Sequence, residues 1–223
     1  MSFDAGAAAK YDKWYLKSGG HYADFREKEL FLKLVKPQKR QQLLEVGCGT
    51  GHNLEFFREL GLDITGVDTS QPMLEKAAQR LGPGARLCRG QANKLDFADK
   101  SFDIVALINV LEFLPDPAGA IREAARVSRK KIYLGVLNKT SILSLTRRVK
   151  GRFGESIYNQ AKFYTIGEIE EMVHSVLSNV SLKWQSVLFF PLGWHCCCHR
   201  PDGWLTFRKN PFGAFLGVYL KLH

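Results

Sequence analysis

Cysteine is scarce in this sequence, and the few residues present do not form a paired set. The chain has 5 cysteines among 223 residues, and an odd number in a chain of this length argues against a disulfide-stapled scaffold. No apolar run is long enough to cross a bilayer, which takes about 20 residues. The first residues lack a basic stretch followed by an apolar one, so we expect no secretory signal. These absences predict a cytoplasmic, reducing location.

Acidic residues are in deficit. The chain has 32 Lys and Arg against 22 Asp and Glu, which gives a formal net charge of +10. This charge permits an anionic partner without identifying one. No RNA-binding module is appended, so we do not expect a nucleic-acid partner. No apolar run is long enough to span a bilayer, so we expect no membrane partner. Repeats are absent and 45% of the residues are hydrophobic, so we predict a single domain over residues 1–223.

A strand, a glycine loop and a helix follow one another at residues 43–60. Leu43, Leu44 and Val46 form a short apolar run that predicts a buried parallel strand. Glycines then stand at 47, 49 and 51, and apolar residues resume at helical spacing. Glycine has no Cβ, so a ligand can lie against the loop, and the helix start presents free N–H groups. This arrangement suits a nucleotide-like or carboxylate-bearing cofactor.

Strands and helices alternate through the rest of the core. We expect further strands at 63–67, 85–88, 104–108 and 131–137. Such alternation predicts an α/β fold with a doubly wound, mostly parallel sheet. Ligands of these sheets bind at the carboxyl ends of the strands. Four such ends carry the glycine loop, Asp68, residues 91–93 and residues 109–113, so we expect them to meet at one crevice.

Two cofactors fit a glycine loop with an acidic residue after the second strand. Asp68 lies at the distance from Gly47 that a dinucleotide fingerprint expects, and the same residue suits S-adenosylmethionine. The fingerprint G-x-G-x-x-G would place its third glycine at 52, where this chain has His52. The third glycine is Gly51 instead, which argues against a dinucleotide-dependent oxidoreductase.

Three segments resemble, in order, the motifs of class I S-adenosylmethionine-dependent methyltransferases. Residues 45–51 resemble the first motif, and residues 66–74 resemble the second. Residues 101–105 and 110–117 resemble the fourth-strand motif of the branch related to UbiE and the type 11 methyltransferases. The resemblance implies a Rossmann-like, seven-stranded sheet with an antiparallel final strand, and S-adenosyl-L-methionine as the cofactor. It also implies transfer of the methyl group to a nucleophilic atom of a small-molecule acceptor.

The resemblance also implies roles by position. Asp68 would bind both ribose hydroxyls, because a carboxylate accepts two hydrogen bonds well. Thr69 and Met73 would flank the adenine, and Glu45 would help to orient the methionyl part. The residues expected at the cofactor from these motifs are Glu45, Gly47, Cys48, Gly49, Gly51, Asp68, Thr69, Met73, Gln91, Ala92, Asn93, Asn109 and Val110.

Methyl transfer from a sulfonium is a displacement at an electrophile that is already activated. Alignment of the acceptor and exclusion of water therefore supply much of the rate. A general base is needed only when the acceptor must lose a proton, and the family often has a histidine where Phe113 stands. The remaining candidates are His21, Tyr11, Tyr164 and His195. No catalytic residue is obligatory, so a non-catalytic protein that binds S-adenosylmethionine or S-adenosylhomocysteine stays an alternative.

The segments outside the core are expected to cover the crevice. Residues 1–40 predict an N-terminal helical cap whose rings, Tyr11 and Trp14 among them, either pack on the core or cover the cofactor. Gly19 and Gly20 are expected to break its helix. Residues 138–164 predict an inserted helical lid, and its basic residues favour an anionic acceptor. Residues 165–223 predict a helix that begins with a capping box, followed by two strands.

The run of His195, Cys196, Cys197, Cys198 and His199 invites a metal interpretation. Structural zinc sites space their ligands so that the chain can fold around the ion, whereas adjacent residues point apart. We therefore expect no metal and interpret the run as a loop with reducible thiols near the mouth of the site. A thiol pocket for a soft substrate such as trivalent arsenic stays an alternative.

Overall fold

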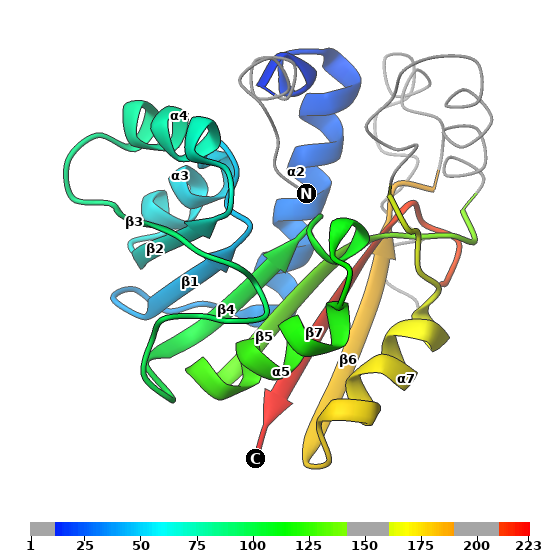
Figure 1. Ribbon diagram of the computed structural model, residues 1–223. Helices are drawn as coiled ribbons and strands as arrows, with labels where there is room; N and C mark the ends of the chain where they lie inside the picture. The colour runs from blue at the N-terminus through cyan, green and yellow to red at the C-terminus, as the bar shows by residue number, and fades with distance from the viewer. Residues whose placement is uncertain (1–11, 142–160, 190–209) are drawn as a thin grey trace.

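A seven-stranded sheet organises the protein (Figure 1). The computed structural model describes residues 12–141, 161–189 and 210–223. The strand order is β3-β2-β1-β4-β5-β7-β6. Strand β7 is antiparallel to both β5 and β6, and the pairs from β3 to β5 are parallel, which confirms the predicted sheet. The strands are β1 (Gln42–Val46), β2 (Asp63–Asp68), β3 (Arg86–Arg89), β4 (Phe102–Ile108), β5 (Ser128–Leu137), β6 (Val180–Val187) and β7 (Phe215–Leu222).

The strand order reverses at β1, which pairs with β2 on one side and with β4 on the other. At its carboxyl end, Val46 lies opposite Val67 of β2 and Leu107 of β4. The three strands therefore finish at nearly the same level. Ligands of such sheets bind at this point, and the glycine loop begins there. The region between the glycine loop, Asp68 and residues 109–113 is called the crevice below.

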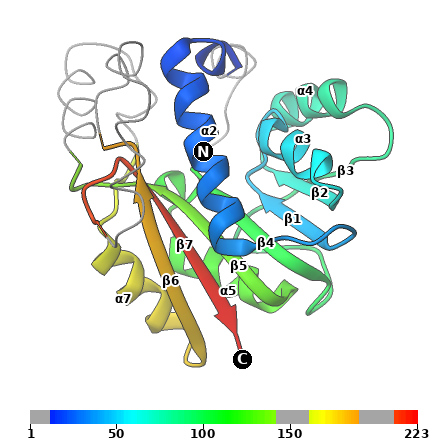
Figure 2. The same ribbon diagram turned by 180° about the vertical axis from the view of Figure 1, so that it is seen from behind.

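Helices cover both faces of the sheet (Figures 1 and 2). Helices α2 (Ser18–Val35), α3 (His52–Glu59) and α4 (Gln71–Leu81) lie on one face, and α5 (Pro117–Val127) and α7 (Ile166–Val176) on the other. A 3-10 turn, η1 (Leu111–Phe113), follows β4. Among the described residues, no helix is long and apolar enough to cross a membrane.

Alternate residues of the central strands feed two apolar layers. On the α2 face, the ring of Phe31 lies 4.7 Å from that of Phe57 and 5.1 Å from that of Tyr133, measured between centroids. On the α5 face, Val105 and Ile121 are fully buried. Each such side chain contributes about 1.5–3 kcal/mol to folding, so the central strands provide a rigid support for the crevice.

The start of α2 corrects one sequence prediction. Gly19 and Gly20 do not break the helix but form its first turn after Ser18. A Cβ at Gly20 would overlap the backbone carbonyl of Trp14. The missing side chain therefore lets the short helical stretch at 12–15 fold back against α2. The prediction that these glycines end a helix was wrong because close packing against Trp14, and not local helix propensity, requires glycine at position 20.

Side chains cap three of the described helices, and the capping box predicted for the last one is confirmed. The Ser70 hydroxyl caps α4 by accepting from the Met73 N–H, and Asp116 caps α5. At α7 the capping box is complete, since the Thr165 hydroxyl accepts from the Glu168 N–H and the Glu168 carboxylate accepts from the Thr165 N–H. The bulk of the lid predicted at 138–164 lies outside the described residues.

Candidate cofactor and methyl-transfer site

The glycine loop is tied to the end of β2. The backbone N–H groups of Gly47 and Cys48 both donate to the Val67 carbonyl, at 2.7 and 3.0 Å. The Gly51 N–H then donates to the Cys48 carbonyl at 2.9 Å, and Gly51 caps α3 in a left-handed conformation with φ of 77°. The loop therefore turns sharply from strand to helix, and its backbone lies at the crevice.

The three glycines meet different surroundings. A Cβ at Gly47 would overlap Val110, and a Cβ at Gly51 would lie 3.1 Å from that of Ala77 on α4. At Gly49, with φ of 52°, a Cβ would meet nothing within 4 Å. Gly47 and Gly51 are thus needed for packing inside the protein, whereas Gly49 faces open space in which a ligand can approach the backbone.

Asp68 stands at the carboxyl end of β2 with its side chain fixed by two backbone groups. Its Oδ2 accepts from the Gly49 N–H at 2.9 Å, and its Oδ1 accepts from the Ser70 N–H at 2.8 Å. A carboxylate has about four acceptor positions. One position on each oxygen is therefore left over, which matches the two hydroxyl donors of a ribose diol.

Glu45 lies beneath the loop and is almost fully buried. Its Oε1 accepts from the Asn53 side-chain amide at 2.8 Å, while its Oε2 has no hydrogen-bond partner. Burial raises the pKa of Glu45 to about 8, with the Asn53 hydrogen bond opposing the shift and the negative charge of Asp68 adding to it. A buried acceptor without a partner next to the crevice fits a cofactor that carries cationic groups.

The chain after β4 forms the other wall. Asn109 adopts a left-handed conformation with φ of 54°, and its N–H donates to the Gly135 carbonyl at 2.8 Å. Its side-chain Oδ1 is buried without a hydrogen-bond partner. Strained non-glycine residues of this kind cluster at ligand sites. Val110 follows and packs on Gly47, so these two predicted residues do lie beside the glycine loop.

The residues predicted to contact the adenine lie at the carboxyl end of the sheet, as the glycine loop does. The Gly90 N–H donates to the Asp68 carbonyl at 3.0 Å, so residues 91–93 follow close to Asp68. Ala92 and Met73 are buried, while Gln91 and Asn93 are exposed and Thr69 is half-buried. Trp14 is half-buried in the cap and packs beside Tyr15. Tyr11 lies outside the described residues.

The proposed general bases differ in accessibility. His21 is exposed on α2. Tyr164 is buried and its hydroxyl donates to the Leu111 carbonyl at 3.2 Å. Burial raises the pKa of Tyr164 to about 12, with the charges of Glu112 and Glu168 adding to the shift, so this hydroxyl is poorly suited to take a proton at neutral pH. His195 and the cysteine run beside it lie outside the described residues.

Glu112 is a buried acid that the sequence analysis did not single out. Its Oε1 accepts from the Leu137 N–H at 2.6 Å, and its Oε2 has no hydrogen-bond partner. Burial raises its pKa to about 7 against the effect of the hydrogen bonds that it accepts from backbone groups. The sequence could have indicated Glu112, because it is the one acid in the apolar stretch Val110–Leu114 and acids are seldom buried without partners.

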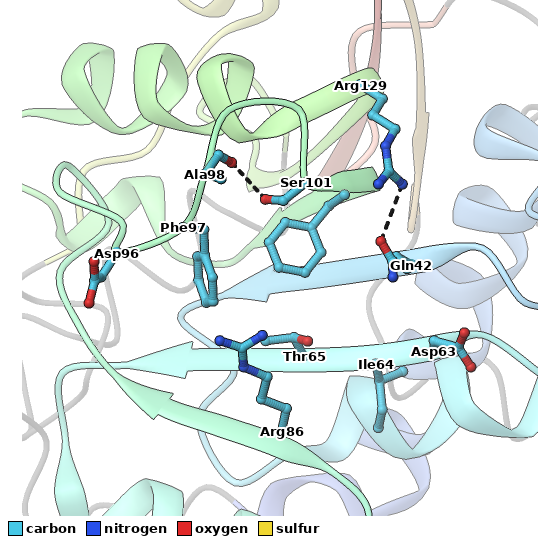
Figure 3. A pocket seen from close by; sticks show the side chains of 11 residues that line it. Gln42, Asp63, Ile64, Thr65, Arg86, Asp96, Phe97, Ala98, Ser101 and Arg129 are labelled. Carbon is cyan, nitrogen blue, oxygen red and sulfur yellow. Dashed lines mark hydrogen bonds between the residues drawn. The ribbon is translucent and has the colours of Figure 1, made fainter.

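A separate cavity of about 610 Å³ lies at the opposite, amino-terminal edge of the sheet (Figure 3). It is lined by the first residues of β1, β2 and β3, namely Gln42, Asp63 and Arg86. Arg129 donates to the Gln42 side chain across it at 3.2 Å. The cavity carries both signs of charge and is far from the glycine loop along each strand, so it is not the predicted crevice. Within the described ranges, no group of His, Cys, Asp and Glu could hold a metal ion.

The fold is Rossmann-like, and the glycine loop and Asp68 lie at the strand ends where sheets of this kind bind their ligands. Residues 44–134 match the methyltransferase domain family. The chain is 31% identical to a ubiquinone biosynthesis O-methyltransferase from Idiomarina loihiensis, over 68% of this chain and 67% of that protein. It is 32% identical to an uncharacterized protein of Methanocaldococcus jannaschii, over 74% of this chain and 76% of that one.

A solved structure agrees with these matches. The S-adenosylmethionine-dependent methyltransferase from Thermotoga maritima has a TM-score of 0.72 and 25% identity, with 98% of each chain covered. This chain belongs to the S-adenosylmethionine-dependent methyltransferase family, and S-adenosylmethionine is its cofactor. The matches agree with the interpretation drawn from the glycine spacing and Asp68.

Proposed function

We propose that the crevice between the glycine loop and residues 109–113 binds S-adenosylmethionine and directs its methyl group to a small, anionic acceptor. Bound S-adenosylmethionine would supply a methyl group on a sulfonium. The acceptor's nucleophilic atom would bond to that methyl carbon as the carbon–sulfur bond breaks, and S-adenosylhomocysteine would leave as a neutral thioether. The protein then has to hold the two reactants in line and keep water out. Asp68 holds the ribose, Gly49 lets the methionyl part approach, and Asn109 and Val110 border the methyl group.

The position of Asp68 carries this proposal. Its carboxylate is oriented by the Gly49 and Ser70 N–H groups before any ligand arrives. A preorganised acceptor pair loses little freedom on binding a diol. The Gly49 N–H also joins the Asp68 carboxylate to the glycine loop, so one hydrogen bond fixes the ribose anchor relative to the loop backbone.

The chemical class of the methyl acceptor is inferred from the charge of the sequence at 147–152. Arg147, Arg148, Lys150 and Arg152 form a basic stretch in the sequence, and we infer that it receives an anionic metabolite. We also propose a cytoplasmic location, which the free thiols of Cys48 and Cys88 support. The division into a cap at 1–40, a core at 41–137, a lid at 138–164 and a C-terminal part at 165–223 belongs to the same proposal.

Removing the ribose anchor tests the proposal. Asp68→Ala is expected to weaken S-adenosylhomocysteine binding at least about tenfold, because a charge-assisted hydrogen bond is worth roughly 1.5–3 kcal/mol. Isothermal titration calorimetry measures the change. Asp63→Ala, at the amino end of the same strand, is the matched control and should keep the wild-type dissociation constant. An unchanged constant in Asp68→Ala would reject Asp68 as the anchor.

A screen of methyl acceptors with radiolabelled cofactor separates an enzyme from a non-catalytic binding protein. We expect labelled product from a small anionic acceptor. Tight cofactor binding with no transfer to any phenol, amine, thiol or carboxylate tested would favour the binding protein.

A further inference from the structure

The N-terminal cap contacts the cofactor loop through side chains that the methyl-transfer proposal does not use. Helix α2 packs on β7, where Leu30 and Phe215 share one buried cluster. The preceding stretch, residues 12–15, folds back over α2 at the space left by Gly20. Figure 2 shows α2 crossing the sheet beside α3, with its first turns at the end of the molecule where β1 and β4 finish.

Asp12 is the first of these contacts. Its Oδ1 accepts from the Thr50 hydroxyl at 2.7 Å and lies 3.0 Å from a guanidinium nitrogen of Arg80. Thr50 stands between Gly49 and Gly51 and is 1% exposed. One carboxylate of the cap therefore holds the middle of the glycine loop and is itself held by α4.

A second set of contacts is made two residues beyond Thr50, at His52. The Tyr15 ring stacks on His52, the first residue of α3, with 3.9 Å between centroids and 26° between planes. The Asp24 carboxylate lies 3.0 Å from the His52 Nε2 and 2.7 Å from the Lys28 ammonium. Although burial acts to raise the pKa of Asp24, hydrogen bonds with His52 and Lys28 hold it below the ordinary value. The cap thus holds both sides of Gly51.

We propose that Asp12 is a positioning residue that couples docking of the cap to occupation of the cofactor site. The Gly49 N–H already fixes Asp68, and Thr50 is the next residue along the loop. A displacement of Thr50 therefore moves Gly49 and the ribose anchor with it. Docking of the cap holds the loop ready for the cofactor, and by linkage a bound cofactor must hold the cap in place. The inference rests on the proposed function of the loop.

The test compares Asp12→Ala, Thr50→Val and the double variant by calorimetry with S-adenosylhomocysteine. We expect each single change to weaken binding about fivefold, and the double variant to be no weaker than the weaker single one, because both changes break the same contact. Asp99→Ala is the matched control, since Asp99 also lies beside an arginine, at 2.7 Å from Arg126, but has no link to the loop. It should bind like the wild type.

Hydrogen exchange separates coupling from a purely structural role. In the wild type, S-adenosylhomocysteine should slow amide exchange across α2, and in Asp12→Ala this protection should be lost while the melting temperature without ligand stays close to that of the wild type. Full additivity of the two single changes, or a wild-type dissociation constant for Asp12→Ala, would overturn the proposal. A wild-type protein that does not bind S-adenosylhomocysteine would instead overturn the proposed function of the loop.

Discussion

At the scale of single residues, the absence of a Cβ serves different purposes at the three glycines of the loop. Gly47 and Gly51 are closed in by Val110 and Ala77, so their hydrogens are needed for packing. Gly49 has open space beside it although its backbone is left-handed. The G-x-G-x-G pattern therefore combines two packing requirements with one position, Gly49, whose open space the proposed function assigns to the ligand.

Alanine substitutions at two of these glycines should separate the requirements. Gly49→Ala is expected to cost about 1 kcal/mol of stability through its positive φ and to abolish detectable S-adenosylhomocysteine binding. Gly47→Ala should lower the unfolding free energy by more, about 2–4 kcal/mol, because Gly47 also has a positive φ of 74° and the new methyl group forces Val110 aside as well. Thermal unfolding and calorimetry measure the pair. Equal loss of stability in both variants, with binding retained in Gly49→Ala, would contradict this assignment.

At the scale of elements, Glu112 joins the turn η1 to the end of β5. Its Oε1 accepts from the Leu137 N–H, and its backbone carbonyl accepts from the Lys162 N–H at 2.9 Å. The residue therefore links the wall of the crevice to the chain that returns before α7. Burial raises its pKa from an ordinary 4.5 to about 7, so this junction responds to pH.

The pH dependence of stability should report this junction. A raised pKa means that the folded protein keeps the proton after the unfolded chain has released it. The contribution of Glu112 is therefore complete below about 4.5 and is lost as pH rises through about 7. Glu45 adds a similar loss that continues to about 8. Calorimetric melting temperatures without cofactor should fall between these limits.

Glu112→Gln should flatten the lower part of this pH dependence, because an amide oxygen still accepts from Leu137 and does not titrate. Glu59→Gln, at an exposed site on α3, is the control and should keep the wild-type slope. A wild-type melting temperature that rises from pH 5 to pH 8, or an unchanged slope in Glu112→Gln, would show that the acid is not held in its neutral form.

At the scale of the whole molecule, local patterns predicted the alternating strands and helices, the parallel core of the sheet and the capping box of α7. The alternation of apolar runs with helical spacing depends on neighbouring residues, as does the capping box at Thr165 and Glu168. The glycine loop and Asp68 could be predicted for the same reason. The glycine loop follows β1 directly and Asp68 is the last residue of β2, and parallel strands bring their carboxyl ends together.

Features that depend on distant packing could not be predicted in this way. Gly20 looked like a helix breaker because its contact with Trp14 exists only after the chain folds back. Asp12 meets Thr50 across the cap, and no local pattern places them together. Glu112 stands out in the sequence as an acid inside an apolar stretch, but its burial and the lack of a hydrogen-bond partner for its Oε2 are known only from the fold. These three depend on tertiary structure rather than on sequence spacing.

The identity of the cofactor is the central claim, and calorimetry on the full chain with S-adenosylhomocysteine and with NAD tests it most directly. The glycine spacing and the two free acceptor positions of Asp68 predict S-adenosylhomocysteine binding with a dissociation constant on the order of 1 μM, equivalent to about 8 kcal/mol, and no detectable heat with NAD. Binding of NAD at that strength, with none for S-adenosylhomocysteine, would contradict the account.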